Sequence, residues 1–155
     1  MEFSLTIHSG GQTGVDRAAL DAALALGVPV GGWCPQGRRS EDGPIASRYV
    51  LRETPSTYYV ERTRWNVRDA DATLILTRGE PTGGTAATAN AARALGKPLR
   101  VVDLAETDDA QPVADWLRDE GIRVLNVAGP RASTTPGIYA EARGFVERLL
   151  RATAG

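Results

Sequence analysis

The segment Ala72–Thr77 restricts the possible folds more than any other part of the sequence. It is short and almost wholly apolar, which is typical of a parallel β-strand that is covered on both faces. A glycine-rich turn follows directly, and an alanine-rich helical pattern then continues to Gly96-Lys97-Pro98. A buried strand that is joined by a tight turn to a helix is the repeating unit of α/β proteins.

Strand and helix patterns alternate along the rest of the chain. This alternation predicts one domain over residues 1–155, with a Rossmann-like three-layer α/β fold. We expect a mostly parallel sheet with helices on both faces. The expected strands are residues 3–7, 28–30, 49–53, 72–77, 99–103 and 122–127; the expected helices are 15–26, 56–70, the alanine-rich segment before 96, 111–120 and a last helix from 135–136 onward.

Three loops each follow an expected strand and precede an expected helix: Ser9–Gly14, Arg78–Thr85 and Gly129–Thr135. In open parallel sheets such loops gather beyond the carboxyl ends of the strands, where ligands bind. Glycines let a ligand approach the backbone, and free N–H groups at a helix start favour an anion such as phosphate. Neither glycine turn has a standard nucleotide-binding spacing, so each is also compatible with a structural turn capped by Thr13 or Thr85.

Arginine side chains near these loops are the expected partners of a phosphate, because charge-assisted hydrogen bonds are stronger than neutral ones. Arg78 is one candidate, although any such arginine is alternatively exposed or paired with a carboxylate. Asp16 would repel an anion and is interpreted as structural. No catalytic residue is predicted, and the predicted ligand-binding residues are Gly10, Gly11, Gln12, Thr13, Gly14, Arg38, Arg39, Thr82, Gly83, Gly84, Thr85, Thr88 and Arg131.

Between residues 38 and 68 the chain has seven arginines and four acidic residues, which indicates a solvated face or an anion-facing patch. The region from Gly31 to Pro44 is glycine-rich and lacks a period, so we expect a loop that is functional or mobile. Aromatic residues in this part of the chain either stack on a base or pterin ring or belong to the core. They are Trp33, Tyr58, Tyr59 and Trp65.

Composition excludes several classes of function. The net charge of −1 argues against general nucleic-acid binding. Because Cys34 and His8 are the single cysteine and histidine, we expect no protein-built metal site and no nucleophile–histidine catalysis. The sequence has no apolar run of membrane-spanning length and no signal-peptide pattern at its start, so we expect a cytoplasmic protein without a membrane partner.

Several short motifs extend over almost the whole chain. They are Ser9–Arg17, Gly32-Trp33-Cys34-Pro35, Gly37-Arg38-Arg39, Glu41-Asp42-Gly43-Pro44, Arg62-Thr63, Asn66-Val67 and Gly129-Pro130-Arg131. In combination these motifs resemble the molybdenum cofactor carrier protein family, within the LOG/DprA-like (SLOG) Rossmannoid group. The resemblance implies a homo-oligomeric protein that holds molybdenum cofactor, a phosphate-bearing pterin, or otherwise a nucleotide, as cargo without turnover. It also suggests a molybdoenzyme as the recipient.

The same group contains nucleotide phosphoribohydrolases, which resemble P-G-G-x-G-T-x-x-E in the second glycine turn. Here that turn is Pro81-Thr82-Gly83-Gly84-Thr85-Ala86-Ala87-Thr88, and Thr88 stands where those enzymes have glutamate. A threonine cannot act as a general acid or base near neutral pH. The resemblance therefore favours binding over catalysis, while a nucleotide-processing enzyme and a nucleotide-sensing module stay open as alternatives.

Overall fold

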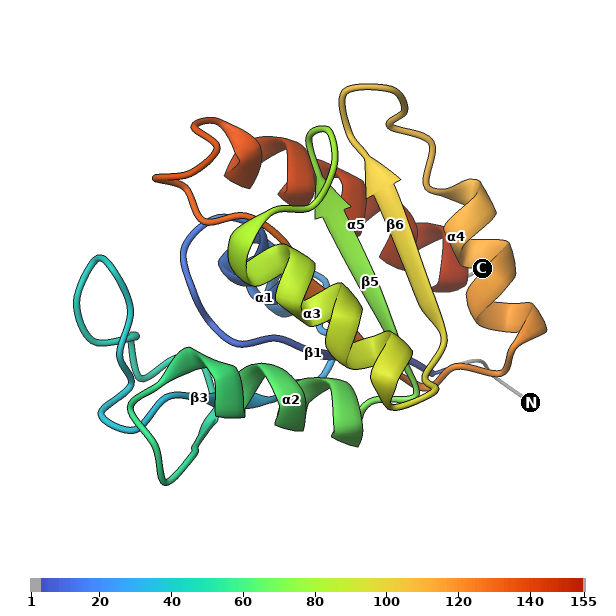
Figure 1. The fold of residues 1–155 in the computed structure, drawn as a ribbon. Coiled ribbons are helices and arrows are strands. Elements are labelled where there is room, and N and C mark those ends of the chain that lie inside the picture. Colours follow the sequence, from blue (N-terminus) through green and yellow to red (C-terminus); the bar gives the residue numbers. More distant parts are fainter. Residues whose placement is uncertain (1–3, 155) are drawn as a thin grey trace.

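A computed structural model describes residues 4–154 and has a five-stranded parallel sheet at its centre, in the order β2-β1-β7-β5-β6. The fold is the Rossmann-like three-layer α/β fold that the sequence predicts (Figure 1). The strands of this sheet are β1 (Thr6–His8), β2 (Val30–Gly31), β5 (Ala72–Thr77), β6 (Leu99–Asp103) and β7 (Val124–Ala128). The helices are α1 (Val15–Ala25), α2 (Tyr59–Asp69), α3 (Gly83–Ala94), α4 (Gln111–Asp119) and α5 (Ile138–Ala154).

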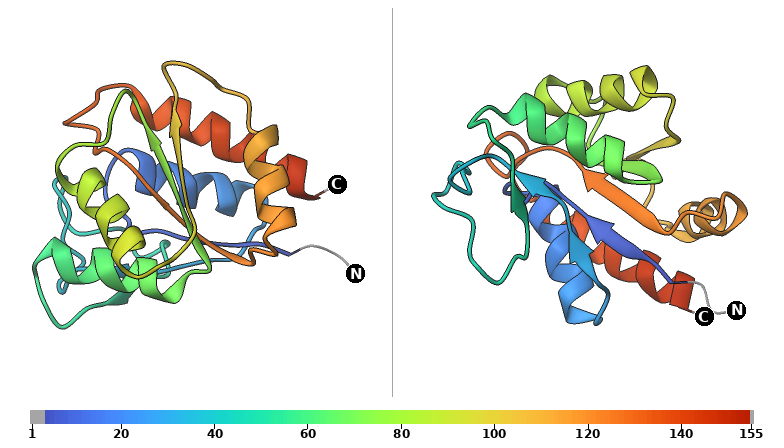
Figure 2. Two further views of the ribbon diagram at one scale, coloured as in Figure 1. Left: turned by 45° about the vertical axis from the view of Figure 1, so that its right-hand side comes forward. Right: turned by 90° about the horizontal axis from the view of Figure 1, so that it is seen from below.

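Helices cover both faces of the sheet. Helices α1 and α5 pack against each other on one face, where α4 contacts α5, and α2 and α3 lie together on the other face (Figures 1 and 2). All six residues of β5 are buried between these layers, as expected for a central parallel strand. Within residues 4–154, no helix has the length and apolarity needed to cross a lipid bilayer.

The helix α1 packs closely because its buried face consists largely of alanine. Ala18, Ala19, Ala22 and Ala23 are fully buried in the same cluster as Phe145 of α5. Small side chains let two helix backbones approach closely, and the larger side chains of α5 fill the remaining space. The alanine pattern in the sequence therefore corresponds to the most extensive helix–helix contact among the described residues.

The strand order places the loops after β1, β7 and β5 side by side. From β1 the chain passes through α1 to the edge strand β2, whereas from β5 it passes through α3 to the opposite edge, β6. The direction of winding changes between these two units, and the last strand, β7, fills the central position. Ligands of open α/β sheets bind at such a change of direction, beyond the carboxyl ends of the strands.

The expected strand 49–53 does not join the central sheet. Only Arg52–Glu53 (β4) is extended, and it pairs with Trp33–Cys34 (β3) in a separate two-stranded parallel sheet. The strand β3 lies within the region that the sequence predicts to be a loop. Residues before β4 instead have their carbonyl groups bound by one side chain: the Arg38 guanidinium donates to the carbonyls of Ile45, Ala46 and Tyr49 at 2.9, 2.8 and 2.7 Å.

Several predicted helix and strand ends are wrong. The N-caps of α1, α2 and α3 are Gly14, Tyr58 and Thr82, and none forms a side-chain capping bond, so Thr13, Ser56 and Thr85 are not caps. The strand β7 begins two residues late because the Asp71 carboxylate binds the N–H groups of residues 123 and 124. The start of the predicted first strand, Phe3, lies outside the described residues.

The last helix also begins later than predicted. The N–H groups of Thr134 and Thr135 donate to the carbonyl of Arg131, at 3.1 and 3.0 Å, and form a tight turn before Ile138. This turn gives the N–H groups of Thr134 and Thr135 a partner ahead of the helix. It also keeps residues 129–135 as a loop at the end of β7.

The glycines of the first turn allow protein segments to approach one another. A Cβ atom on Gly14, where φ is +79°, would lie 2.3 Å from the carbonyl oxygen of Pro130. A Cβ atom on Gly10 would lie 2.2 Å from Nη1 of Arg62. Close packing between the loops after β1 and β7, and between the first loop and α2, therefore accounts for these glycines without a ligand.

We predict that Gly14→Ala destabilises the protein far more than Gly27→Ala. Both glycines have positive φ, but a Cβ on Gly27 would meet no atom within 4 Å. We expect a loss of about 1 kcal/mol for Gly27→Ala, from backbone strain alone, and more than about 3 kcal/mol for Gly14→Ala. Urea unfolding of both variants measures the difference, and equal losses would contradict the packing role.

Candidate functional site

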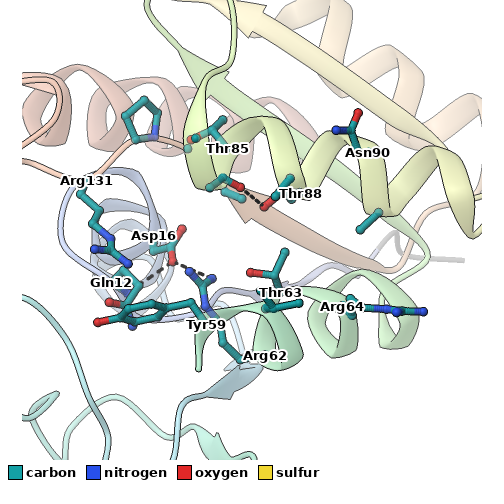
Figure 3. Close-up of a pocket in the computed structure, with 18 of the residues that line it drawn as sticks. Gln12, Asp16, Tyr59, Arg62, Thr63, Arg64, Thr85, Thr88, Asn90 and Arg131 are labelled. Carbon is teal, nitrogen blue, oxygen red and sulfur yellow. Dashed lines mark hydrogen bonds and ion pairs between the residues drawn. The ribbon is translucent and has the colours of Figure 1, made fainter. Parts of the chain in front are cut away.

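A cavity of about 750 Å³ lies where the loops after β1, β7 and β5 meet, and it continues between α2 and α3 (Figure 3). Its walls come from the loop after β1, the first half of α2, most of α3 and the loop after β7. The volume lies within the range of small-molecule binding sites. The cavity therefore occupies the position that the strand order favours for a ligand.

The start of α3 forms one wall of the cavity. Gly83 and Gly84 line it, and a Cβ atom on either would meet no atom within 4 Å. These two glycines thus leave the backbone open to the cavity, unlike those of the first turn. The N–H groups in the first turn of a helix have no partner within the helix and carry partial positive charge, which favours an anion there.

Threonines surround this helix start. Thr82, Thr85 and Thr88 all line the cavity, as the sequence predicts for ligand contacts. The Thr88 hydroxyl donates to the carbonyl of Gly84 at 3.1 Å, so its proton is used within α3. Thr88 consequently offers an approaching ligand acceptor capacity rather than a free donor.

Arg131 and Tyr59 lie together at the opposite side (Figure 3). The Arg131 guanidinium carbon is 4.3 Å from the centre of the Tyr59 ring. The guanidinium groups of Arg39 and Arg62 lie 5.2 and 5.8 Å from the same ring centre. Tyr59 therefore gathers three cations, of which Arg62 and Arg131 line the cavity.

A buried ion pair lies beside this group. Arg62 Nη1 is 3.5 Å from Asp16 Oδ2, and the backbone N–H of Gln12 donates to the same oxygen at 3.3 Å. Burial raises the pKa of Asp16, and the charge of Arg62 opposes that rise. Burial also lowers the pKa of Arg62. The sequence indicates a structural role for Asp16 and misses Arg62 as a site residue, whereas the structure places both in the cavity wall.

Some residues predicted to bind a ligand lie away from the cavity wall. Arg38 holds residues 45–49, as described above, and Arg39 donates to the carbonyl of Thr57 at 3.3 Å. The Arg78 guanidinium is paired with the Glu141 carboxylate. Of the predicted site residues, Gln12, Thr82, Gly83, Gly84, Thr85, Thr88 and Arg131 line the cavity, whereas Gly10, Gly11, Thr13, Gly14, Arg38 and Arg39 are not among its lining residues.

The aromatic residues divide in the same way. Trp33 and Trp65 pack edge to face, with ring centres 4.8 Å apart, and join β3 to α2. Tyr58 is 73% exposed and does not line the cavity. Of the four aromatic residues considered from the sequence, Tyr59 is the one in the cavity wall.

Glu41 connects two of the loops that form the site. Its carboxylate accepts hydrogen bonds from the hydroxyls of Thr13 and Ser133, and the N–H of Ser133 lies 3.4 Å from it. The Thr13 hydroxyl in turn accepts from the N–H of Ala132 at 3.2 Å. Sequence reasoning missed this bridge, although Glu41 belongs to a motif of the family resemblance. The bridge fixes the loop that carries Arg131.

Comparison with known proteins agrees with this geometry. A family model, described as the circularly permuted YpsA SLOG family, matches residues 7–150. The chain belongs to this family. The match confirms the SLOG resemblance inferred from the sequence. A search of curated proteins found no match.

A crystal structure of a protein from Syntrophus aciditrophicus SB is similar to this chain over almost the whole length of both. Its protein, provisionally named a molybdenum carrier protein, is 41% identical to this chain. The alignment covers 96% of each chain with a TM-score of 0.91. Residues 4–154 contain no cluster of three or more His, Cys, Asp or Glu side chains that could hold a metal ion.

We predict that the Glu41 bridge weakens in acid. Hydrogen bonds from Ser133, and then from Thr13, hold the pKa of Glu41 below its usual 4.5. Because the folded-state pKa is depressed, the stabilisation is present above pH 4.5 and is lost as the pH falls through the folded-state value. Hydrogen exchange of residues 129–135, corrected for intrinsic rates, should increase in that range. Glu41→Gln should remove this step, and an unchanged step in the variant would contradict the role of Glu41.

Proposed function

We propose that this protein is a carrier of molybdenum cofactor, which binds the phosphorylated pterin in the cavity without turnover. One observation carries the proposal: the cavity combines the open start of α3 with the Arg131 side chain. The name of the 41% identical protein from Syntrophus aciditrophicus SB supports the same ligand. The cavity volume suits a single small molecule of this kind.

The phosphate is proposed to lie at the start of α3, between Gly83-Gly84 and Arg131. A helix start contributes only about 0.3–1 kcal/mol to an anion, so a cationic side chain is needed as well. Arg131 lines the same cavity and has no carboxylate partner among the salt bridges of the described residues. Its charge is therefore available to a phosphate.

The organic part of the ligand is proposed to lie between α2 and α3. There the wall includes the apolar side chains of Ala87 and Ala91 in α3, Leu95 just after it and Val60 in α2. Polar side chains of the same wall are Thr63, Arg64 and Asn90. The apolar part of this surface favours the flat face of a ring, which loses little by leaving water. The cavity would thus bind a molecule with one anionic end and one planar end.

The proposed role does not require catalysis or a metal bound by protein side chains. Thr88 occupies the position of the glutamate in the related hydrolases, and its hydroxyl proton is used within α3. Molybdenum would arrive held by the sulfur atoms of its pterin. We further propose that the carrier is cytoplasmic and homo-oligomeric and that a molybdoenzyme receives the cargo.

Anaerobic titration of the purified protein with molybdenum cofactor, metal-free molybdopterin, AMP and molybdate tests the ligand assignment. We expect both pterins to bind more tightly than molybdate, because molybdate offers only an oxyanion to the helix start. Gly84→Val should abolish pterin binding and leave the fold intact, since its Cβ faces open space. Ala86→Val, on the same helix turn but outside the lining, is the matched control.

The carrier proposal fails if AMP binds tightly and the pterins do not, and a nucleotide sensor would then replace it. Release of free base from AMP at enzymic rates would instead favour the nucleotide-processing enzyme. Unchanged pterin affinity in folded Gly84→Val would remove the helix start from the site.

We predict that Arg131→Ala weakens phosphate-bearing ligands by about 1.5–3 kcal/mol, the range of a charge-assisted hydrogen bond. A dephosphorylated analogue should lose little affinity. Isothermal titration of both ligands measures the difference, with the exposed Arg151→Ala as a charge-matched control. Equal losses for the two ligands would show that Arg131 does not contact the phosphate.

A further inference from the structure

We propose that Gln12, Asp16 and Arg62 form a recognition site for the 2-amino-4-oxo edge that pterins share with guanine. This inference rests on the proposed function, because it assigns the ring-recognising residues of the same cavity. It goes beyond that function by naming the chemical edge that the protein selects. Adenine, which lacks this edge, would be rejected.

The first observation is a set of polar atoms without partners. Gln12 and Asp16 are each 2% exposed and line the cavity with Arg62. Gln12 Oε1 and Arg62 Nε are buried, and no hydrogen-bond partner is present for either among the described residues. A buried polar atom that is left without a partner destabilises the protein. Two adjacent side chains with unmet hydrogen-bonding capacity indicate a polar group that enters from outside the chain.

The second observation concerns the Asp16 carboxylate. Arg62 Nη1 and the backbone N–H of Gln12 both donate to the same carboxylate oxygen, Oδ2. Figure 3 shows the other oxygen directed away from these two partners, toward the side of α3. Asp16 therefore presents an ionisable acceptor to the cavity while its ion pair stays intact.

These atoms match one ring edge in chemical type. Arg62 Nε is a donor, whereas Asp16 Oδ1 and Gln12 Oε1 are acceptors. The 2-amino-4-oxo edge presents the complement: a carbonyl oxygen, a ring N–H and an amino group. Adenine presents a ring nitrogen acceptor and one amino group, so it would leave part of the set unsatisfied. Sites built around buried polar groups reject analogues that lack the matching groups.

The orientation of the Gln12 amide is fixed by its other contacts. Its Nε2 donates to the carbonyls of Arg39 and Gly10, at 3.0 and 3.4 Å. An amide rotated by half a turn would place its oxygen against two carbonyl oxygens. Oε1 is therefore the acceptor atom that remains for a ligand.

The charges allow a phosphorylated ligand to bind here. Asp16 alone would repel a phosphate, but Arg62 neutralises it, and Arg131 adds a further positive charge nearby. The phosphate is favoured at the start of α3, away from the carboxylate. The ligand would bind with its anionic end at α3 and its donor-bearing edge at Asp16.

A nucleotide series tests the proposal with the unaltered protein. GMP, IMP and AMP carry the same ribose and phosphate, but GMP has the full edge, IMP lacks the amino group and AMP lacks both the carbonyl and the ring N–H. Isothermal titration should give affinities in the order GMP, IMP, AMP, with about tenfold lost at each step. Guanosine, which lacks the phosphate, reports on the phosphate contribution separately.

Variants assign the preference to the named residues. Asp16→Asn keeps an oxygen for Arg62 and Gln12 and turns an amino group to the cavity, so the GMP preference over AMP should fall to about one. Gln12→Met should reduce the preference for GMP over AMP about tenfold. This variant tests recognition of the 2-amino-4-oxo edge even if Asp16→Asn does not fold. Asp42→Asn makes the same chemical change in an exposed loop and should leave the preference unaltered.

The outcomes separate this inference from the proposed function. Equal affinity for GMP and AMP, with guanosine much weaker than both, would overturn edge recognition and leave the phosphate site intact; buried water would then satisfy Gln12 Oε1 and Arg62 Nε. Molybdopterin binding without a GMP preference over AMP would also overturn it. If neither molybdopterin nor any nucleotide binds, both proposals fail.

Discussion

The buried ion pair between Asp16 and Arg62 is the interaction on which the cavity depends, because it joins the start of α1 to α2 across 46 residues of sequence. Burial of two charges costs more than their attraction returns unless further hydrogen bonds support them. Here the Gln12 N–H supplies such a bond, and Gly10 provides the space, since a Cβ there would overlap Arg62. The glycine at position 10 and the position of α2 are thus tied to one electrostatic contact.

The two glycine turns have similar composition but opposite physical roles. In the first, glycine is required because other parts of the chain fill the volume in front of it, as Pro130 does at Gly14. In the second, the volume in front of Gly83 and Gly84 is open. Composition and position after a strand are identical signals in both cases. Only the packing of distant segments distinguishes a turn that joins the protein to itself from one that faces a ligand.

This difference explains which features the sequence could predict. Local periodicity predicts the layers, the buried strand β5 and the alternation of strands and helices. The parallel sheet then predicts that the loops gather at the ends of the strands. Three polar residues were missed or misassigned: Arg62 and Glu41 because their partners lie far along the chain, and Arg38 because its guanidinium is used within its own loop. Arg62 meets a carboxylate 46 residues away, Glu41 meets Ser133 across 92 residues, and Arg38 binds carbonyl groups in its own loop. The failed cap at Thr13 has the same cause, since Glu41 engages the Thr13 hydroxyl that local rules assign to α1.

The gathering of Arg39, Arg62 and Arg131 around Tyr59 links occupancy of the cavity to conformational stability. Burial lowers the pKa of Arg62, the charge of Asp16 opposes this, and the charge of Arg131 lowers the pKa further, so Arg62 and Arg131 repel one another. An anion bound among the arginines would make this electrostatic contribution to stability favourable. A ligand that binds only the folded state shifts the unfolding equilibrium toward that state by mass action. Tyr59 belongs to the first turn of α2, so an anion bound among these arginines would stabilise this turn. A ligand-bound molecule would therefore be more rigid at the start of α2 than a ligand-free one.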